Sequence, residues 1–144
     1  LAGMAPVDGY EIPHRLREAV HLRTPADTFP YAANTTRTQQ QLDHTTAYLA
    51  PDHGGPPAQT GLHNLAPMTR HHHRIKTFGR WQLKQPYPGI HLWRDPHGTL
   101  YLVDHTGTRK LGNTEPATES DNLTIDVHPA RPDLQAHYER HHAA

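Results

Sequence analysis

Apolar residues recur at helical spacing in two segments of the chain. The first is PHRLREAVHLR, residues 13–23, in which Leu16, Val20 and Leu22 fall toward one face. Pro13 suits the first turn of a helix, because a proline there loses no intrahelical hydrogen bond. The pattern predicts a helix of about three turns over residues 13–23.

The second segment with helical spacing begins at Asn64. It carries Leu65, Met68, His72 and Ile75 on one face, with a proline in its first turn and Gly79 at its end. The pattern predicts a helix over residues 64–79. The histidine run 71–73 would then lie on this helix.

Strict alternation of apolar and polar residues marks three further segments. RWQLKQ, PGIHLWRD and GTLYLVD alternate at Trp81/Leu83, Ile90/Leu92 and Leu100/Leu102, and PYPG and DPHG supply turns between them. The alternation predicts an antiparallel hairpin or small meander. LDHTTAYL, residues 42–49, predicts one more strand that enters a long turn at PDHGGPP.

The remaining segments are polar or rich in turn residues. Residues 24–41 predict a loop or a short strand, residues 1–8 a flexible N-terminus, and residues 107–144 a polar, partly disordered C-terminal tail with a short helix at 132–142. The expected fold is a single small α+β domain over residues 9–106. With 10 glycines and 14 prolines among 144 residues, its core should be modest.

Composition narrows the possible chemistry. The chain has no cysteine and 15 histidines, so His, Asp and Glu are the available metal ligands. The mean hydropathy is −0.84 and no apolar run is long enough to cross a bilayer, which predicts a soluble, cytoplasmic protein without a membrane partner. The formal net charge is zero, yet residues 70–84 hold five basic and no acidic side chains.

Four polar residues follow one another in an informative order. Asp43 and His44 stand on the predicted strand, Asn64 follows the long turn, and His73 lies on the predicted helix. A strand, a loop and a helix that bring these residue types together are the parts of a ββα-metal nuclease site. For each residue alone, an ordinary role is as good an explanation: a strand end, a helix N-cap or a solvated helix face.

The segment from LDHTTAY to GTLYLV, which includes NLAPMTRHHHRIKT, closely resembles the HNH endonucleases of actinobacteria and their phages. These are commonly found at the C-terminal end of a helical domain of unknown function. The resemblance covers about residues 9–105 and includes residue type, spacing and order. It implies a divalent-metal-dependent endonuclease that hydrolyses phosphodiester bonds in DNA.

The resemblance also implies roles for single residues. His44 would be the general base that takes a proton from the attacking water, and Asn64 would orient its imidazole by a hydrogen bond. Asp43 and His73 would hold one metal ion, with Mg²⁺ expected first and Mn²⁺, Ni²⁺ or Zn²⁺ as alternatives. The phosphate-binding cations would be Arg70, Arg74 and Lys76.

Because adjacent residues of a strand point to opposite faces, Asp43 and His44 can serve one site only if the strand bends or ends there.

One feature of the family is missing. Many relatives hold a structural zinc by three cysteines and a further His or Cys, and the corresponding positions here are Asp27, Ala32, Thr69 and His72. Asp27 and His72 could still bind a metal, but two ligands do not make a tetrahedral structural site. We therefore expect the structural zinc to be absent.

Other functions remain open on the sequence. The main alternative is a catalytically silent HNH-like DNA-binding module whose basic helix contacts phosphates. A third interpretation treats the histidines as a metal store or structural metal clip. Because the net charge is zero, DNA affinity could depend on a homodimer or on an N-terminal domain that precedes this segment.

Overall fold

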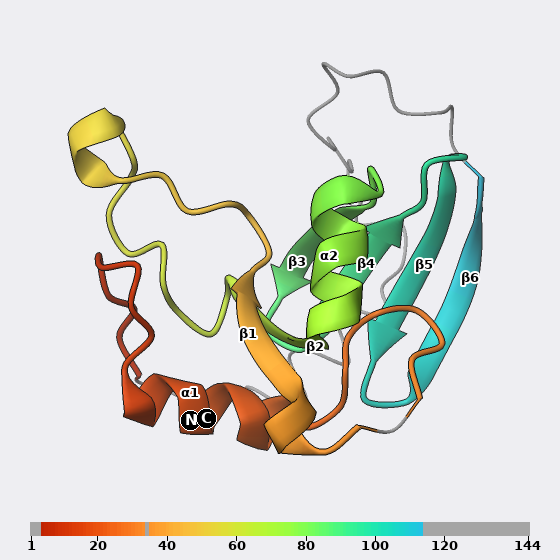
Figure 1. Ribbon diagram of the computed structural model, residues 1–144, viewed down its shortest axis with the longest axis horizontal. Coiled ribbons are helices and arrows are strands. Elements are labelled where there is room, and N and C mark those ends of the chain that lie inside the picture. The colour runs from red at the N-terminus through yellow and green to blue at the C-terminus, as the bar shows by residue number, and fades with distance from the viewer. Residues whose placement is uncertain (1–3, 34, 114–144) are drawn as a thin grey trace.

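The computed structural model describes residues 4–33 and 35–113. They form an α+β fold in which the elements described are two α-helices and two antiparallel sheets (Figure 1). The elements in chain order are α1 (His14–Arg23), β1 (Gln40–His44), β2 (Leu65–Thr69), α2 (Arg70–Phe78), β3 (Gln82–Tyr87), β4 (Ile90–Arg94), β5 (Thr99–Asp104) and β6 (Gly107–Asn113). Two short 3-10 turns, Arg37–Gln39 and Pro51–His53, lie before and after β1.

Strands β1 and β2 form an antiparallel pair that leads directly into α2. The predicted helix over 64–79 is therefore wrong in its first part, since Leu65–Thr69 is a strand and the helix begins at Arg70. Thr69 is the N-cap, and its hydroxyl accepts a hydrogen bond from the backbone N–H of His72 at 3.3 Å. The helix ends at Phe78 with Gly79 as its C-cap, as predicted, and it carries the histidine run.

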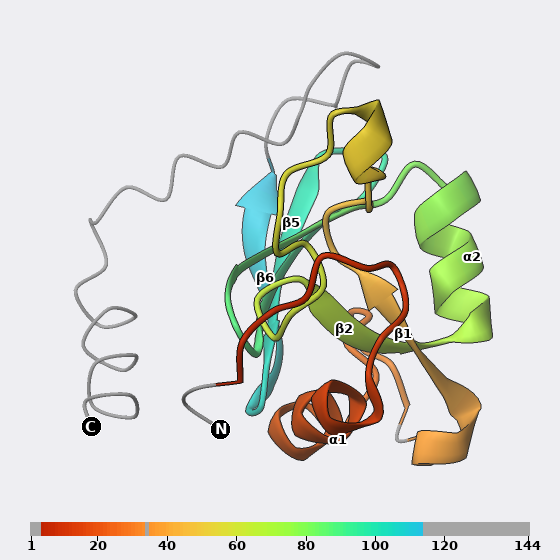
Figure 2. The ribbon, with the colours of Figure 1, turned by 90° about the vertical axis from the view of Figure 1, so that its left-hand side faces the viewer.

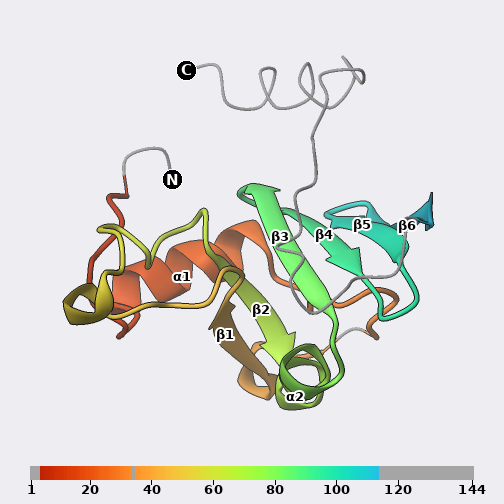
Figure 3. The same ribbon diagram turned by 90° about the horizontal axis from the view of Figure 1, so that it is seen from above.

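Strand β2 is covered on both faces, which places it at the centre of the molecule. Leu65 packs with Leu16 and Val20 of α1. Ala66 and Met68, on the opposite face, pack against the larger sheet through Leu83, Trp93 and Val103. This double burial holds β1, β2 and the start of α2 between α1 and the larger sheet, an arrangement visible when α2 is seen end-on (Figure 3).

The larger sheet has the strand order β3-β4-β5-β6, and every neighbouring pair is antiparallel. The predicted meander over β3, β4 and β5 is thus confirmed, and Trp93 is fully buried in its core. Residues 107–113, assigned to a polar tail from the sequence, instead form the edge strand β6. The rest of that predicted tail, including the short helix at 132–142, lies outside the described residues.

Helix α1 agrees with its prediction apart from its apolar face. Pro13 stands just before the first helical residue, and Leu16 and Val20 are buried. Leu22 is 74% exposed, because the buried face continues through Ala19 and His21 instead. None of the helices within 4–33 and 35–113 is both long and apolar enough to span a bilayer.

The N-terminal segment is fixed from Val7 onward, although residues 1–8 were predicted to be flexible. Val7 forms an antiparallel bridge with Thr60, and the Asp8 carboxylate accepts a hydrogen bond from the N–H of Ala58 at 2.7 Å. This segment therefore lies along the β1–β2 connection, beside which it runs in Figure 2. It brings residues 7–10 close to the end of β1.

The β1–β2 connection folds back on itself through close backbone contacts. A side chain at Gly55 would place its Cβ 1.8 Å from the carbonyl oxygen of Leu49, so only glycine fits there. The side chain of Gln59 bonds both backbone groups of Leu49, at 2.9 and 2.6 Å. The long turn predicted from PDHGGPP is therefore an ordered loop that delivers Thr60 and Asn64 to the end of β1.

Candidate active site at the end of β1

The structure brings Asp43 and His73 together across β1 and α2. Oδ1 of Asp43 lies 3.5 Å from Nε2 of His73, although thirty positions separate the two residues. Both side chains are partly exposed, at 20% and 37%. The pair offers one carboxylate and one imidazole to a cation at the surface.

Lys76 joins this pair, one turn further along α2. Its Nζ lies 2.6 Å from Oδ2 of Asp43 and also donates to the backbone oxygen of His44 at 2.7 Å. The side chain is only 17% exposed. We predicted Lys76 as a phosphate ligand, but here its ammonium group is engaged by the carboxylate and the end of β1.

His44 lies on the other side of β1. Its Nε2 is 2.9 Å from the hydroxyl of Thr60, and its ring stacks on Tyr10 with a centroid distance of 5.4 Å. His44 is 5% exposed, so Tyr10 and the loop cover most of the imidazole. Burial lowers the pKa of His44, the nearby Asp43 carboxylate opposes that shift and the Lys76 ammonium adds to it.

The opposite directions of Asp43 and His44 follow from strand alternation, and β1 ends at His44. The strand ends where the sequence required, and the two side chains remain on opposite sides of it, Asp43 toward α2 and His44 toward Tyr10 and Thr60. A groove of about 580 Å³ borders the His44 side, between the N-terminal segment, α1 and β1. Its lining includes Tyr10, Arg17, Gln41 and His44.

Asn64 stabilises the loop, and its side-chain hydrogen bonds within the described residues go to loop residues and not to the imidazole. Its Oδ1 accepts from the Thr45 hydroxyl at 2.8 Å and the Thr46 N–H at 2.7 Å, while its Nδ2 donates to the carbonyls of Thr46 and Gln59. Within the described residues none of these bonds reaches His44, so the predicted hydrogen bond is wrong. Asn64 is also not a helix N-cap, a position that Thr69 occupies.

Asp27 and His72, predicted as remnants of a structural metal site, form a hydrogen-bonded junction. Oδ2 of Asp27 lies 2.6 Å from Nδ1 of His72 and accepts the backbone N–H of Thr69 at 2.8 Å. Its Oδ1 accepts the N–H of Phe29, also at 2.8 Å. The carboxylate is fully buried, so it ties the 27–29 loop to the N-terminus of α2.

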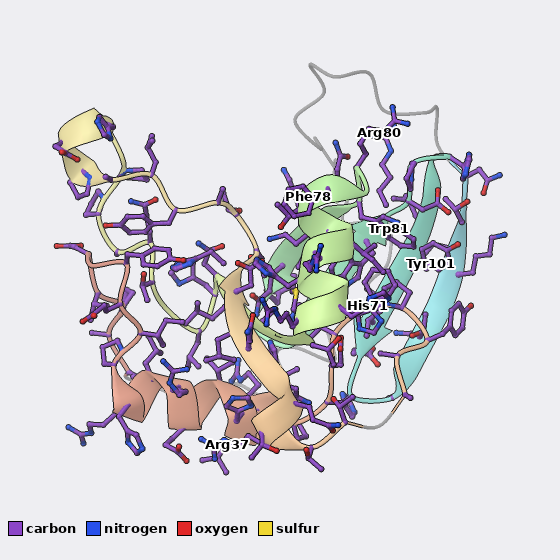
Figure 4. The ribbon with its side chains drawn as sticks, viewed as in Figure 1. Arg37, His71, Phe78, Arg80, Trp81 and Tyr101 are labelled. Carbon is purple, nitrogen blue, oxygen red and sulfur yellow. The ribbon has the colours of Figure 1, made fainter. Side chains whose placement is uncertain are left out.

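The two arginines predicted to bind phosphate are exposed on α2. Arg70 and Arg74 are not engaged in an ion pair within residues 4–33 and 35–113, in contrast to Lys76. Phe78, which is 77% exposed, and Arg80 lie at the C-terminal end of the same helix, with His71 near its start (Figure 4). The helix therefore presents positive charge and one aromatic ring on its outer surface.

A metal at Asp43 and His73 would have two protein ligands. No cluster of three or more His, Asp or Glu side chains able to hold a metal occurs in the described part of the chain. Mg²⁺ typically takes one or two carboxylates and completes its coordination with water and substrate phosphate, and transition ions accept mixed oxygen and nitrogen ligands. Asp43 and His73 are donors of these types, and the Lys76 ammonium group is paired with one oxygen of the carboxylate.

The architecture defines a small α+β fold whose β1–β2 pair and α2 carry the polar cluster. Comparison of the chain with models of protein families, with curated proteins and with solved structures finds no match. The function therefore has to be argued from the cluster itself. Thr60 and Tyr10, both in contact with His44, were missed because neither belongs to a recognisable motif.

Proposed function

We propose that this protein is a divalent-metal-dependent DNA endonuclease of the HNH type, with β1, β2 and α2 as its ββα-metal core. The observation that carries the proposal is the approach of Asp43 and His73 to 3.5 Å. Residues thirty positions apart meet at a partly exposed surface, and His44 directly follows one of them. These are the residues to which the resemblance assigns the metal and the general base.

His44 is the group that takes the proton from water in this proposal. Burial lowers the pKa of its imidazole, which keeps the ring neutral near pH 7 and able to accept a proton. Water would reach His44 from the groove that its side chain lines. Asn64 contributes by holding Thr45 and Thr46, which directly follow His44, in place.

The surface of α2 supplies the binding contacts. Arg70 and Arg74 are exposed. Their proposed role is to bind phosphates, which positions DNA without reading its sequence. Asp43 and His73 would hold the divalent ion, which when bound stabilises negative charge on the phosphate under attack. The Lys76 ammonium group lies 2.6 Å from the Asp43 carboxylate, so the ion would have to share that carboxylate with it or displace it.

The test is cleavage of supercoiled plasmid with Mg²⁺, Mn²⁺, Ni²⁺ or Zn²⁺ supplied one at a time. The wild-type protein should nick or cut the plasmid with at least one ion, and EDTA should stop the reaction. His44→Gln should lower the rate by about 100-fold or more, because it removes the base. Asp43→Asn and His73→Ala should weaken both cleavage and metal binding measured by calorimetry.

A matched control is available in the same histidine run. His71 is exposed on α2, so His71→Ala should leave cleavage close to wild type. Circular dichroism of each variant separates loss of chemistry from loss of fold. Plasmid that stays supercoiled with every ion, in protein that is folded, would contradict the nuclease.

A second candidate is a silent DNA-binding module, and the burial of His44 favours it. An imidazole that is 5% exposed, and a carboxylate already paired with Lys76, are compatible with a site that no longer reacts. This function predicts DNA binding that weakens steeply with salt, no cleavage, and an affinity that His44→Gln leaves unchanged. The plasmid assay and a salt titration of binding together separate the two functions.

A further inference from the structure

The Thr60 hydroxyl stands between the His44 ring and the N-terminal segment. Its Oγ1 lies 2.9 Å from Nε2 of His44 and 2.7 Å from the carbonyl oxygen of Gly9. Thr60 is 0% exposed, so water does not compete for these bonds. The three groups form a short hydrogen-bonded chain that ends on the backbone.

The direction of this chain follows from the donors available. A carbonyl oxygen can only accept, so the single proton of the Thr60 hydroxyl is donated to Gly9. The hydroxyl oxygen must then accept from His44, which requires the ring proton to be on Nε2. In the neutral imidazole the lone pair is therefore on Nδ1.

The surrounding backbone holds Thr60 firmly. Its N–H and C=O both bond Val7, at 3.1 and 2.8 Å, so the backbone that carries the hydroxyl is held in place. Tyr10, directly after Gly9, stacks on the His44 ring. The segment from Val7 to Tyr10 thus becomes part of the site.

We propose that Thr60 is a positioning residue for His44: anchored to the Gly9 carbonyl, it fixes the imidazole in the form protonated on Nε2 and leaves Nδ1 as the proton acceptor. This inference rests on the proposed nuclease function for its consequence in catalysis. The hydrogen-bond assignment itself can be measured without DNA or metal. Thr60 has this effect through His44 and does not touch the reacting phosphate.

The first experiment is nitrogen-15 NMR of the wild-type protein at neutral pH, with His44 assigned by the signals lost in His44→Gln. We expect Nε2 of His44 to have the chemical shift of a protonated nitrogen and Nδ1 that of an unprotonated one. The reverse assignment overturns the proposal. Only the His44→Gln variant used for assignment has to fold. If it does not fold, His44 can be assigned by selective labelling of the wild-type protein.

The second experiment compares two substitutions of the same residue. Thr60→Val keeps the shape but removes the hydroxyl, and Thr60→Ser keeps the hydroxyl but removes a methyl group. We expect Thr60→Val to lower kcat by about 100-fold with little change in KM, because it removes the acceptor for the Nε2 proton. NMR of this variant should show a mixture of the two neutral tautomers of His44, one protonated on Nε2 and one on Nδ1. Thr60→Ser should restore most of kcat and the single ring form.

The outcomes separate this proposal from the function on which it rests. If both variants lose activity equally, or if Thr60→Val keeps kcat and a single ring form, Thr60 does not position His44. If wild-type protein shows the expected ring form but never cleaves DNA, the nuclease function fails and the catalytic role of Thr60 fails with it. A wrong ring form in an active enzyme rejects the positioning role alone.

Discussion

Nζ of Lys76 lies 2.6 Å from the Asp43 carboxylate that we propose as a metal ligand. A divalent ion at Asp43 and His73 would have to share that carboxylate with the ammonium group or displace it. Lys76→Met removes the charge and keeps the chain length. We therefore expect calorimetry with Mn²⁺ to show at least about tenfold tighter binding in Lys76→Met, a gain of about 1.4 kcal/mol.

Lys84→Met is the matched control, because Lys84 is exposed on β3 and outside the cluster. Its Mn²⁺ affinity should equal that of the wild type. Equal affinity in Lys76→Met and wild type would show that the ammonium group does not compete with the ion. Weaker binding in Lys76→Met would instead mean that Lys76 orients Asp43 for the metal.

The Asp27 junction predicts a fold that is stable without zinc. Both carboxylate oxygens of Asp27 accept hydrogen bonds from N–H groups. In Asp27→Asn one oxygen becomes an NH₂ group, which cannot accept, so at least one of these N–H groups faces another donor. We expect a loss of about 2 kcal/mol in the free energy of unfolding, measured with urea. Asp52→Asn, whose side chain is 79% exposed, should change stability by less than about 0.5 kcal/mol.

EDTA provides an independent check on the same junction. The thermal midpoint of the wild-type protein should be the same with and without the chelator, because hydrogen bonds to Asp27, without a metal ion, join the 27–29 loop to the start of α2. A lower midpoint in EDTA would show that a bound metal contributes to folding.

Sequence patterns identified β3, β4 and β5 as strands, and the second half of the 64–79 segment is helical as predicted. Burial in β4 is not confined to one face, because Leu92 is buried on the face opposite to Trp93. Strand β2 was missed because both of its faces are buried, so its apolar residues do not alternate. Its Leu65 and Met68 also happen to have helical spacing.

Strand β6 escaped detection for the opposite reason. GTRKLGN is almost entirely exposed at the edge of the sheet, and its polar sequence is indistinguishable from a loop. Only its pairing with β5 makes it a strand. Edge strands of this kind are defined by tertiary contact, which one sequence does not reveal.

The candidate site was partly predictable. The resemblance implied that Asp43 and His73 lie together, and they are 3.5 Å apart, although β2 between them was predicted as helix. The partners of Asn64, Lys76 and His44 could not be predicted, since they depend on how the long loop and the N-terminal segment approach β1. Thr60 is a single threonine in a loop and gives no signal in the sequence.

We expect the stability of the core to depend strongly on one hydrogen bond of Trp93. Its side chain is fully buried, and its Nε1 donates to the carbonyl oxygen of Thr28 at 2.6 Å. Trp93→Phe leaves that carbonyl without its partner and creates a small cavity. Urea unfolding should show a loss of about 2 to 3 kcal/mol, and less for Trp81→Phe, because Trp81 is only partly buried.

His91 on β4 predicts that stability falls in mild acid. Burial lowers its pKa to about 4 from the usual 6.5, although hydrogen bonding to the Val103 backbone and the Asp104 charge oppose the shift. Between these two values the unfolded chain binds a proton that the folded protein does not, so stability must decrease as the pH falls from about 6.5 to 4. The shift corresponds to a loss of about 3 kcal/mol across that window.

Urea unfolding of the wild type and His91→Leu at several pH values between 7 and 4 tests this link. The variant is expected to be less stable at pH 7, where the Val103 bond is lost, but its stability should fall less steeply with acid. His97→Leu, an exposed residue in the β4–β5 turn, controls for the change in histidine number. Parallel pH profiles for the wild type and His91→Leu would show that His91 does not remain neutral in the core.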